Sequence, residues 1–208
     1  MNEYEKKFYV LEYNPECSGV PSYIDKEYIP ELPYFDIFTA PPKREDFAEI
    51  YHLRTKVKEM SADYFIIDDI ASDKIIEISK KLNIGFISIP LDVRIYGRKQ
   101  PEKKYNLFYL TDYISMLDEK ESHYEISKDL ETGRLNTPEE MGVDKIYYEK
   151  ITKFIVKKGV EKNLFFCNEI IKPVCSEKFK DLYESQSLSG VKFIPIDNNF
   201  SYNAWGDD

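Results

Sequence analysis

Two adjacent carboxylates, Asp68 and Asp69, follow a short apolar run at residues 64–67 in the stretch YFIIDDIAS. If the run is a strand, the two acids lie where the chain leaves the sheet, and side chains there can face a ligand. Paired acids can act as general acid and base or hold Mg²⁺ through their oxygens. The alternative, which we favour, is a polar turn before a helix capped by Ser72. Asp68 and Asp69 are therefore candidates for binding.

Sequence patterns for other chemistry do not occur. The two histidines, His52 and His123, are far apart, whereas a zinc site needs clustered Cys and His at short spacing. Neither GxGxxG nor GxxxxGKS/T is present, so no phosphate-binding loop is indicated. The sequence thus predicts no metal, no cofactor and no catalytic residue.

The three cysteines, Cys17, Cys167 and Cys175, form no CxxC pair and no even disulfide framework. This usage is typical of a reducing compartment. A Cys–His–Asp site on Cys17 or Cys175 stays open, because the members of a triad need not be neighbours in sequence. Cys167 and Cys175 lie in apolar runs, which favours a packing role for both.

One segment is strongly basic: residues 94–105 read RIYGRKQPEKKY. Basic side chains with interleaved aromatics can bind single-stranded nucleic acid. Gly97 and Pro101 instead favour the tip of a hairpin, where charge discourages pairing between sheet edges. We favour the solvated hairpin tip.

Residues 198–208, NNFSYNAWGDD, hold the only tryptophan of the chain. The segment is expected to be a flexible tail, with an aromatic and acidic contact element as the alternative, since Trp and Tyr often anchor interfaces. Together with Asp68 and Asp69, its residues complete the predicted partner-binding set: Tyr202, Trp205, Asp207 and Asp208.

Composition limits the class of protein. The chain has 208 residues, of which 42% are hydrophobic and 15% aromatic, as expected for one folded domain covering residues 1–208. Its formal net charge of −9 opposes binding to nucleic acid or to anionic membranes and favours a basic protein partner. No apolar stretch reaches the roughly 18–20 residues of a membrane span, and the N-terminal residues lack a secretory pattern. We therefore expect a cytoplasmic protein.

Hydrophobic periodicity predicts two related strand–helix–strand units, at about residues 64–92 and 164–197. Each has a serine cap and an acid in the first turn, Ser72 with Asp73 and Ser176 with Glu177. Each then ends its helix near a glycine and returns as a strand containing a proline, which we expect at a sheet edge or strand end. Such a unit cannot bury its apolar face alone, so two of them can share one core.

Further strands are predicted at residues 7–13, 34–38, 105–110 and 146–156, while residues 43–58 are undecided, with a possible helix face. The simplest arrangement is an α+β fold, in which a few short helices pack on one mixed, mainly antiparallel sheet.

Three stretches of the second half, DYISMLDEKES, NLFFCNEIIKPVCSEKFKDLY and LSGVKFIPID, carry a family resemblance that covers about residues 105–197, with residues 7–13 also in keeping. Through them the chain resembles an immunity-protein family of bacterial polymorphic toxin systems, formerly a domain of unknown function. The positions that match the family pattern are Asp118, Ser122, Ser176, Leu188, Gly190, Phe193 and Pro195. The chain departs from the pattern at Phe166 and Cys167, near a position where the family often has arginine.

The resemblance implies a small cytoplasmic protein that binds and blocks a cognate toxin domain delivered by neighbouring cells, through contact-dependent or type VI secretion routes. It implies no catalytic residues, because protection is by occupancy. The acidic chain favours a basic, nuclease-like toxin as the partner. Two alternatives stay open: a metal-dependent hydrolase using clustered carboxylates such as Asp68 and Asp69, and a non-enzymatic adaptor of a secretion apparatus.

Overall fold

The computed structural model describes residues 6–206 except 18, 37–39, 130 and 136–146. Its helices are α1 (Asp73–Lys81) and α3 (Glu177–Ser185), with single 3-10 turns η1 (Arg44–Asp46) and η2 (Tyr96–Arg98). The strands are β1 (Phe8–Tyr13), β2 (Glu27–Ile29), β3 (Tyr51–Arg54), β4 (Tyr64–Phe65), β5 (Ile70–Ser72), β6 (Phe86–Arg94), β7 (Tyr105–Leu110), β8 (Tyr113–Ile114), β9 (His123–Ile126), β10 (Tyr148–Lys153), β11 (Leu164–Cys167), β12 (Lys172–Ser176), β13 (Val191–Pro195) and β14 (Tyr202–Asn203).

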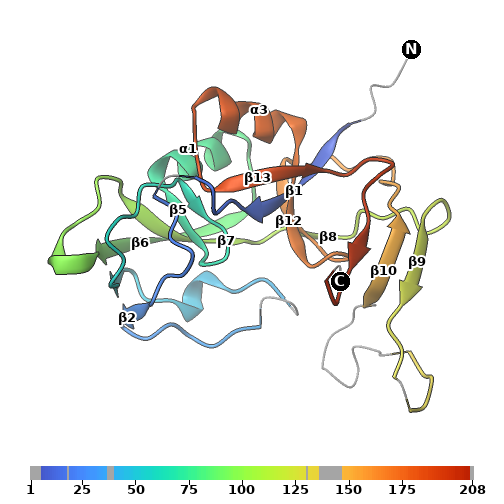
Figure 1. The fold of residues 1–208 in the computed structure, drawn as a ribbon, viewed down its shortest axis with the longest axis horizontal. Helices are drawn as coiled ribbons and strands as arrows, with labels where there is room; N and C mark the ends of the chain where they lie inside the picture. The colour runs from blue at the N-terminus through green and yellow to red at the C-terminus, as the bar shows by residue number, and fades with distance from the viewer. Residues whose placement is uncertain (1–5, 18, 37–39, 130, 136–146, 207–208) are drawn as a thin grey trace.

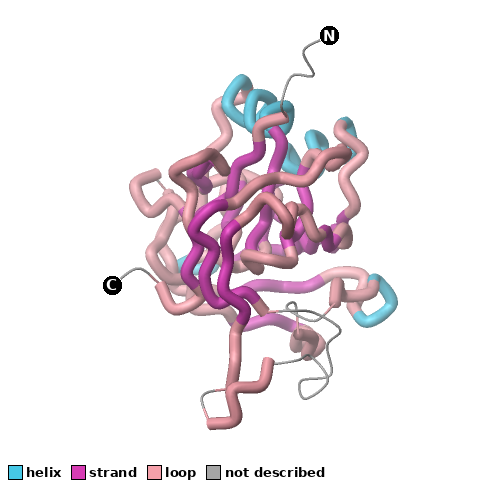
Figure 2. The backbone as a smooth tube through the Cα atoms, turned by 90° about the vertical axis from the view of Figure 1, so that its right-hand side faces the viewer, coloured by secondary structure: helices cyan, strands magenta, loops and turns pink. Residues whose placement is uncertain are grey.

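The described strands form three sheets. Their orders are β13-β1-β12-β11-β8, β14-β10-β9 and β2-β3-β6-β7-β5-β4, and only the pairs β3–β6 and β8–β11 are parallel. The α+β class with a mainly antiparallel arrangement is confirmed, although the single predicted sheet is divided into three. The two helices lie beside each other over the larger sheets, and the small sheet of β9, β10 and β14 lies at the far end of the molecule (Figure 1; Figure 2).

The two predicted units have the same topology. In each, a hairpin leads into a nine-residue helix and then into a returning strand: β4, β5, α1 and β6 in one, and β11, β12, α3 and β13 in the other. A strand from elsewhere in the chain lies between the hairpin and the returning strand and pairs antiparallel with both. This strand is β7 in the first unit and β1 in the second.

Local hydrogen bonds also repeat between the units. The Ser72 hydroxyl donates to Oδ1 of Asp63, and the Ser176 hydroxyl donates to Oδ1 of Asn163, both at 2.9 Å. The Ser176 hydroxyl also accepts from the amide of Phe179 at 3.4 Å, as predicted for a cap. Ser72 occupies the cap position of α1, but its side chain makes no cap bond, so that part of the prediction is wrong. Its hydroxyl is turned to the buried Asp63 instead.

The helices bury apolar stripes in a core that both units share. Ile75 and Ile78 of α1 pack in one cluster with Phe179 and Tyr183 of α3 and with Phe108 of β7. The cluster also takes in Leu11 and Leu164, which come from strands of the five-stranded sheet. Each unit thus covers apolar surface of the other. This burial removes from water the apolar faces that a single unit would leave exposed, and so stabilises both.

Polar contacts join the units at two equivalent positions. The Asp63 amide donates to the Ser189 carbonyl at 2.8 Å, and the Ser189 amide donates to Oδ2 of Asp63 at 3.2 Å. Lys103 Nζ also donates to Oδ2 of Asp63, at 2.7 Å. In the other direction, Nδ2 of Asn163 donates to the carbonyl of Leu82 at the end of α1, at 3.2 Å. Each residue therefore contacts the chain that follows the helix of the opposite unit.

The proline-rich N-terminal region differs from its predicted structure. Tyr34 and its neighbours up to residue 36 are loop, residues 37–38 lie outside the described part, and the strand of this region is β2. Residues 43–58 form η1 and then β3, in which Tyr51 and Leu53 are buried between exposed His52 and Arg54. This two-residue alternation overrides the helical spacing that Phe47, Ile50 and Tyr51 indicate.

The two prolines of the returning strands have different positions. Pro195 ends β13 at a sheet edge, as predicted. Pro90 lies within β6, an interior strand, so the edge prediction is wrong there. The pairing of β6 with β3 begins only at Leu91, so Pro90 precedes that ladder and its missing amide hydrogen does not interrupt it.

The C-terminal segment is paired rather than loose where it is described. Tyr202 of β14 pairs with Ile151 of β10, and the Phe200 ring contacts Phe154 edge-on at 5.8 Å. The predicted strand at residues 146–156 is confirmed as β10, with residue 146 outside the described part.

Replacement of Gly190 tests the contact between the units. Gly190 has φ +118°, and a Cβ there would overlap the Tyr64 carbonyl oxygen. We expect Gly190→Ala to lower the free energy of unfolding by about 3 kcal/mol, from backbone strain and displacement of β4. Gly133→Ala is the control, since Gly133 has φ +67° but open space where a Cβ would stand, and should cost only ~1 kcal/mol. Equal losses in urea unfolding would contradict the close approach.

Asp63 is 2% exposed and accepts from Ser72, Lys103 and Ser189. Asp63→Ala leaves these donors unpaired, so we expect a loss of about 3–5 kcal/mol in the free energy of unfolding. Asp63→Asn should cost about 1–2 kcal/mol, because the amide keeps an oxygen for Ser189 and can donate to the Ser72 hydroxyl. Urea denaturation checks both variants. If the two lose the same stability, the negative charge matters and the hydrogen-bond geometry does not.

Candidate functional site

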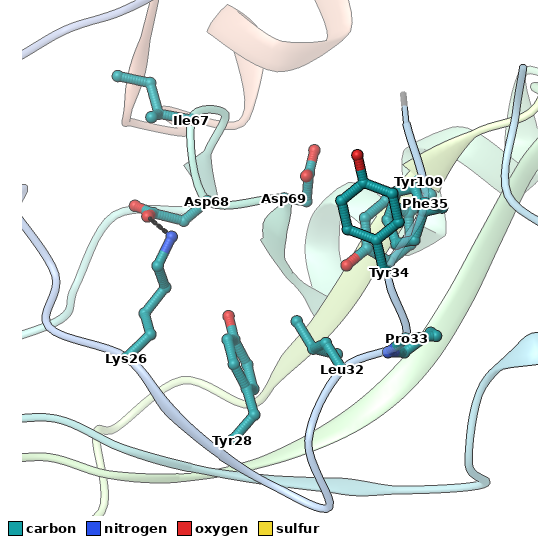
Figure 3. A pocket seen from close by; sticks show the side chains of 10 residues that line it. All are labelled: Lys26, Tyr28, Leu32, Pro33, Tyr34, Phe35, Ile67, Asp68, Asp69 and Tyr109. Atoms are coloured by element: carbon teal, nitrogen blue, oxygen red, sulfur yellow. Dashed lines mark hydrogen bonds and ion pairs between the residues drawn. The ribbon is translucent and has the colours of Figure 1, made fainter. Parts of the chain in front are cut away.

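A cavity of about 300 Å³ lies between the β4–β5 turn and the chain that runs through β2 into the proline-rich segment. The turn supplies its acidic side, and β2, the following loop and β7 supply aromatic and aliphatic side chains (Figure 3). The cavity is lined by Lys26, Tyr28, Leu32, Pro33, Tyr34, Phe35, Ile67, Asp68, Asp69 and Tyr109.

The backbone of the turn places the acids at the cavity. Asp69 has φ +52°, a left-handed conformation that Asp tolerates better than most residues. Its carbonyl accepts from the Phe108 amide at 2.7 Å, which ties the turn to β7. The Asp68 amide donates to the Phe65 carbonyl at 3.0 Å and closes the turn on itself. The predicted polar turn is therefore confirmed, and it carries the predicted binding residues Asp68 and Asp69 into one cavity.

The two carboxylates have different environments. Asp68 Oδ1 accepts from Lys26 Nζ at 2.6 Å (Figure 3). The Asp69 carboxylate has no hydrogen bond or ion pair with any described residue. Burial raises the pKa of Asp69 from 3.8 to about 7, with Asp68 adding to the rise and Lys26 opposing it. Asp69 is thus half-buried, changes charge near neutral pH and forms no ion pair with a described residue.

Aromatic side chains form the opposite side of the cavity. Tyr109 is 3% exposed, and its ring contacts Phe35 edge-on at 5.1 Å and stacks on Phe47 at 5.2 Å. The hydroxyls of Tyr109 and Tyr28 have no hydrogen-bond partner among the described residues. Burial raises the pKa of both tyrosines, with the Asp69 charge contributing, so both hydroxyls stay protonated at neutral pH.

Two large apolar side chains stand at the rim. Tyr34 is 97% exposed and Ile67 is 69% exposed, whereas most large apolar side chains of the described part are covered. An exposed aromatic and an exposed aliphatic residue beside a recess are typical of a contact surface.

The sequence did not indicate the aromatic part of this cavity. Tyr28, Tyr34 and Tyr109 belong to separate stretches that no short motif connects. They meet because β2 pairs with β3, β3 with β6, and β6 with β7. The one available signal was the aromatic run YFDIF between prolines, which indicated an ordered loop without its position.

The tail residues of the predicted partner-binding set are not at the cavity. Tyr202 is half-buried on β14 and packs with the core beneath the small sheet, and Trp205 is 81% exposed. Asp207 and Asp208 lie outside the described residues. The predicted set is therefore divided between two separate places in the fold.

The other candidate residues from the sequence lie where they serve packing or a hairpin connection. Cys167 and Cys175 are buried, as predicted for packing, and burial raises the pKa of both thiols. The basic segment of residues 94–105 joins the antiparallel strands β6 and β7, which confirms the hairpin tip. Its Lys103 is committed to Asp63 at 2.7 Å. Within the described ranges, no group of three His, Cys, Asp or Glu side chains is placed to hold a metal ion.

A second cavity, of about 450 Å³, lies between β8 and the turn at residues 157–162. Its charged groups are the exposed Lys157 and Lys158, with Glu161 and Lys162 beside them. Lys162 is already paired with Asp112 at 2.8 Å. The carboxylate that lines this cavity, Glu161, is exposed, whereas Asp69 of the first cavity is half-buried.

No protein-family model matches the sequence, and a search of curated proteins found no match. None of the described helices has the length and apolar character needed to cross a membrane. The geometry of the Asp69 cavity is therefore the main guide to function.

The Asp69 environment predicts a dependence of stability on pH. The pKa of Asp69 is about 7 in the folded protein, above the ordinary 3.8. The contribution of Asp69 to the free energy of unfolding is therefore fully present below about pH 4 and is lost as the pH rises to about 7. Asp69→Asn removes this loss. Between pH 4 and pH 7 the free energy of unfolding of the variant should therefore rise by about 1–3 kcal/mol relative to that of the wild type. Urea unfolding across the pH range measures the difference. Asp181→Asn, at an exposed position on α3, controls for the lost charge, and parallel curves for wild type and Asp69→Asn would contradict the expectation.

Proposed function

We propose that this protein is an immunity protein, which binds a cognate antibacterial toxin in the cytoplasm and neutralises it by stoichiometric occlusion. The cavity at Asp69 and its rim form the contact surface in this proposal. The observation that carries it is the pairing of exposed Tyr34 and Ile67 with an unpaired carboxylate in the recess between them. The resemblance of residues 105–197 to immunity proteins supports the same function.

The chemistry of the surface supports a basic protein as the partner. Tyrosine is enriched among the few residues that supply most of the binding energy at interface centres, and complementary charge accelerates association. The net charge of −9 and the acids of the β4–β5 turn favour approach of a positively charged toxin domain. A stable complex would bury about 1,200–2,000 Å² in total, so the cavity would be the centre of a larger contact.

A hydrolase is the second candidate, because a carboxyl whose pKa is raised to about 7 in a recess suits general acid–base catalysis. It predicts that Asp69→Asn abolishes turnover of a substrate, while changes at exposed Tyr34 leave the chemical step intact.

Co-expression tests the proposed function. A toxic protein encoded beside this chain should kill cells that lack it and be tolerated in cells that have it, and the two should co-purify. The double variant Tyr34→Ala/Ile67→Arg should protect poorly, since loss of two central contacts weakens binding by about 100-fold or more.

Tyr96→Ala is the matched control, because Tyr96 is also an exposed tyrosine but lies at the β6–β7 tip. Protection by the double variant as strong as by Tyr96→Ala would exclude this surface. Failure of the wild type to protect or to bind would overturn the proposed function itself.

A further inference from the structure

We propose that the Asp69 cavity is a receptor for a single arginine side chain of the protein partner, with the guanidinium between the Asp69 carboxylate and the hydroxyls of Tyr28 and Tyr109. The inference rests on the proposed function and names the group that the contact surface recognises.

The first argument is the set of polar groups without partners. The Asp69 carboxylate forms no ion pair with a described residue, because the nearby Lys26 is paired with Asp68 at 2.6 Å and acts on Asp69 only from a distance. The hydroxyl of the nearly buried Tyr109 lacks a hydrogen bond within the described part of the chain, and it emerges beneath Tyr34 at the cavity (Figure 3). These oxygens are open to the cavity and are not sealed in the core, so a ligand with several donors can reach them, and its bond to the charged carboxylate is charge-assisted.

The second argument is the identity of the ligand. Carboxylates repel anions, so the cavity selects a neutral or cationic group that donates hydrogen bonds. Guanidinium carries five donors in one plane, pairs with a carboxylate through two of them and stacks on aromatic faces. The cavity offers such faces at Tyr28, Tyr34 and Phe35, so it fits guanidinium better than a point-like ammonium.

The third argument is size and lining. A volume of about 300 Å³ is at the lower end for ligand pockets, which suits one long side chain rather than a cofactor. Leu32 and Pro33 supply apolar surface for the methylene stem of arginine, and the open mouth lets the stem return to a partner backbone. The exposed rim would then contact the residues that flank the arginine.

The charges around Asp69 give the site a pH dependence. The facing titratable groups are Lys26, Asp68, Tyr28, Tyr64, Tyr109 and Tyr113. Burial raises the pKa of each of the four tyrosines, so across neutral pH these tyrosines stay neutral while Asp69 changes charge. Binding of a guanidinium should be tighter by up to ~10-fold near pH 8 than near pH 6.

The probe is N-acetylarginine amide, titrated into the 208-residue protein and followed by two-dimensional NMR. We expect saturable shifts at the amides of Asp69 and Phe108, which the Asp69 carbonyl links, with a Kd of about 1–10 mM for such a fragment. N-acetylcitrulline amide has nearly the same shape without the charge and should bind at least ~10-fold more weakly.

Variants assign the contacts. Asp69→Asn should lower the affinity for the arginine probe by ~10-fold or more. Tyr109→Phe, which removes only the hydroxyl, should lower it by ~3–10-fold. Asp181→Asn on α3 removes an equal charge away from the cavity and should leave binding unchanged. No saturable binding by the wild type, equal binding of citrulline, or full binding by Asp69→Asn would each overturn the inference.

The two proposals fail separately. If the probe does not bind but the wild type still protects cells, the arginine receptor is wrong and the immunity function stands. If the probe binds in an Asp69-dependent manner but no protection occurs, the receptor stands and the immunity function is wrong.

Discussion

The buried carboxylate of Asp63 is the constraint on which the arrangement of the two units depends. It accepts from Ser72 within its own unit, from Lys103 beside β7 and from Ser189 of the other unit. Removal of a carboxylate from water is costly unless its oxygens find donors, so these groups must stay together. The start of β4 is thereby fixed against the chain that enters β13, where Gly190 leaves no room for a side chain. Asn163 makes the corresponding connection from the second unit to the end of α1.

The same four-residue turn serves different purposes in the two units. In both, the last residue is left-handed, Asp69 at φ +52° and Ile171 at φ +54°. In the second unit the turn directs Glu169 inward, where its carboxylate accepts from the amides of Met116 and Leu117 at 3.2 Å. Glu169 therefore stabilises the chain that follows β8, and its carboxylate already has hydrogen-bond donors. In the first unit the turn instead presents acids to a cavity, and the Asp69 carboxylate is left without a partner.

This difference explains why one turn is structural and the other is available for binding. A carboxylate that already accepts two amide hydrogens offers little to a ligand, whereas a half-buried acid without donors is a strong acceptor for a cation. The aromatic wall built by Tyr28, Phe35 and Tyr109 lowers the local polarity and raises the Asp69 pKa to about 7. Exposed Tyr34 and Ile67 then extend the recess outward into a surface that a partner can cover.

The sequence by itself determined the two units, because their signals are local. The cap at Ser176, the apolar stripes such as Ile75 with Ile76, and the glycine before β13 act within a few residues of where they stand. The position of Asp68 and Asp69 in a polar turn was predictable for the same reason. The cavity was decided only by the tertiary structure, because three successive strand pairings bring Tyr28 and Tyr109 to that turn. So was the difference between the two acids, since Lys26, 42 residues away from Asp68 in the chain, lies where it forms an ion pair with Asp68 and not with Asp69.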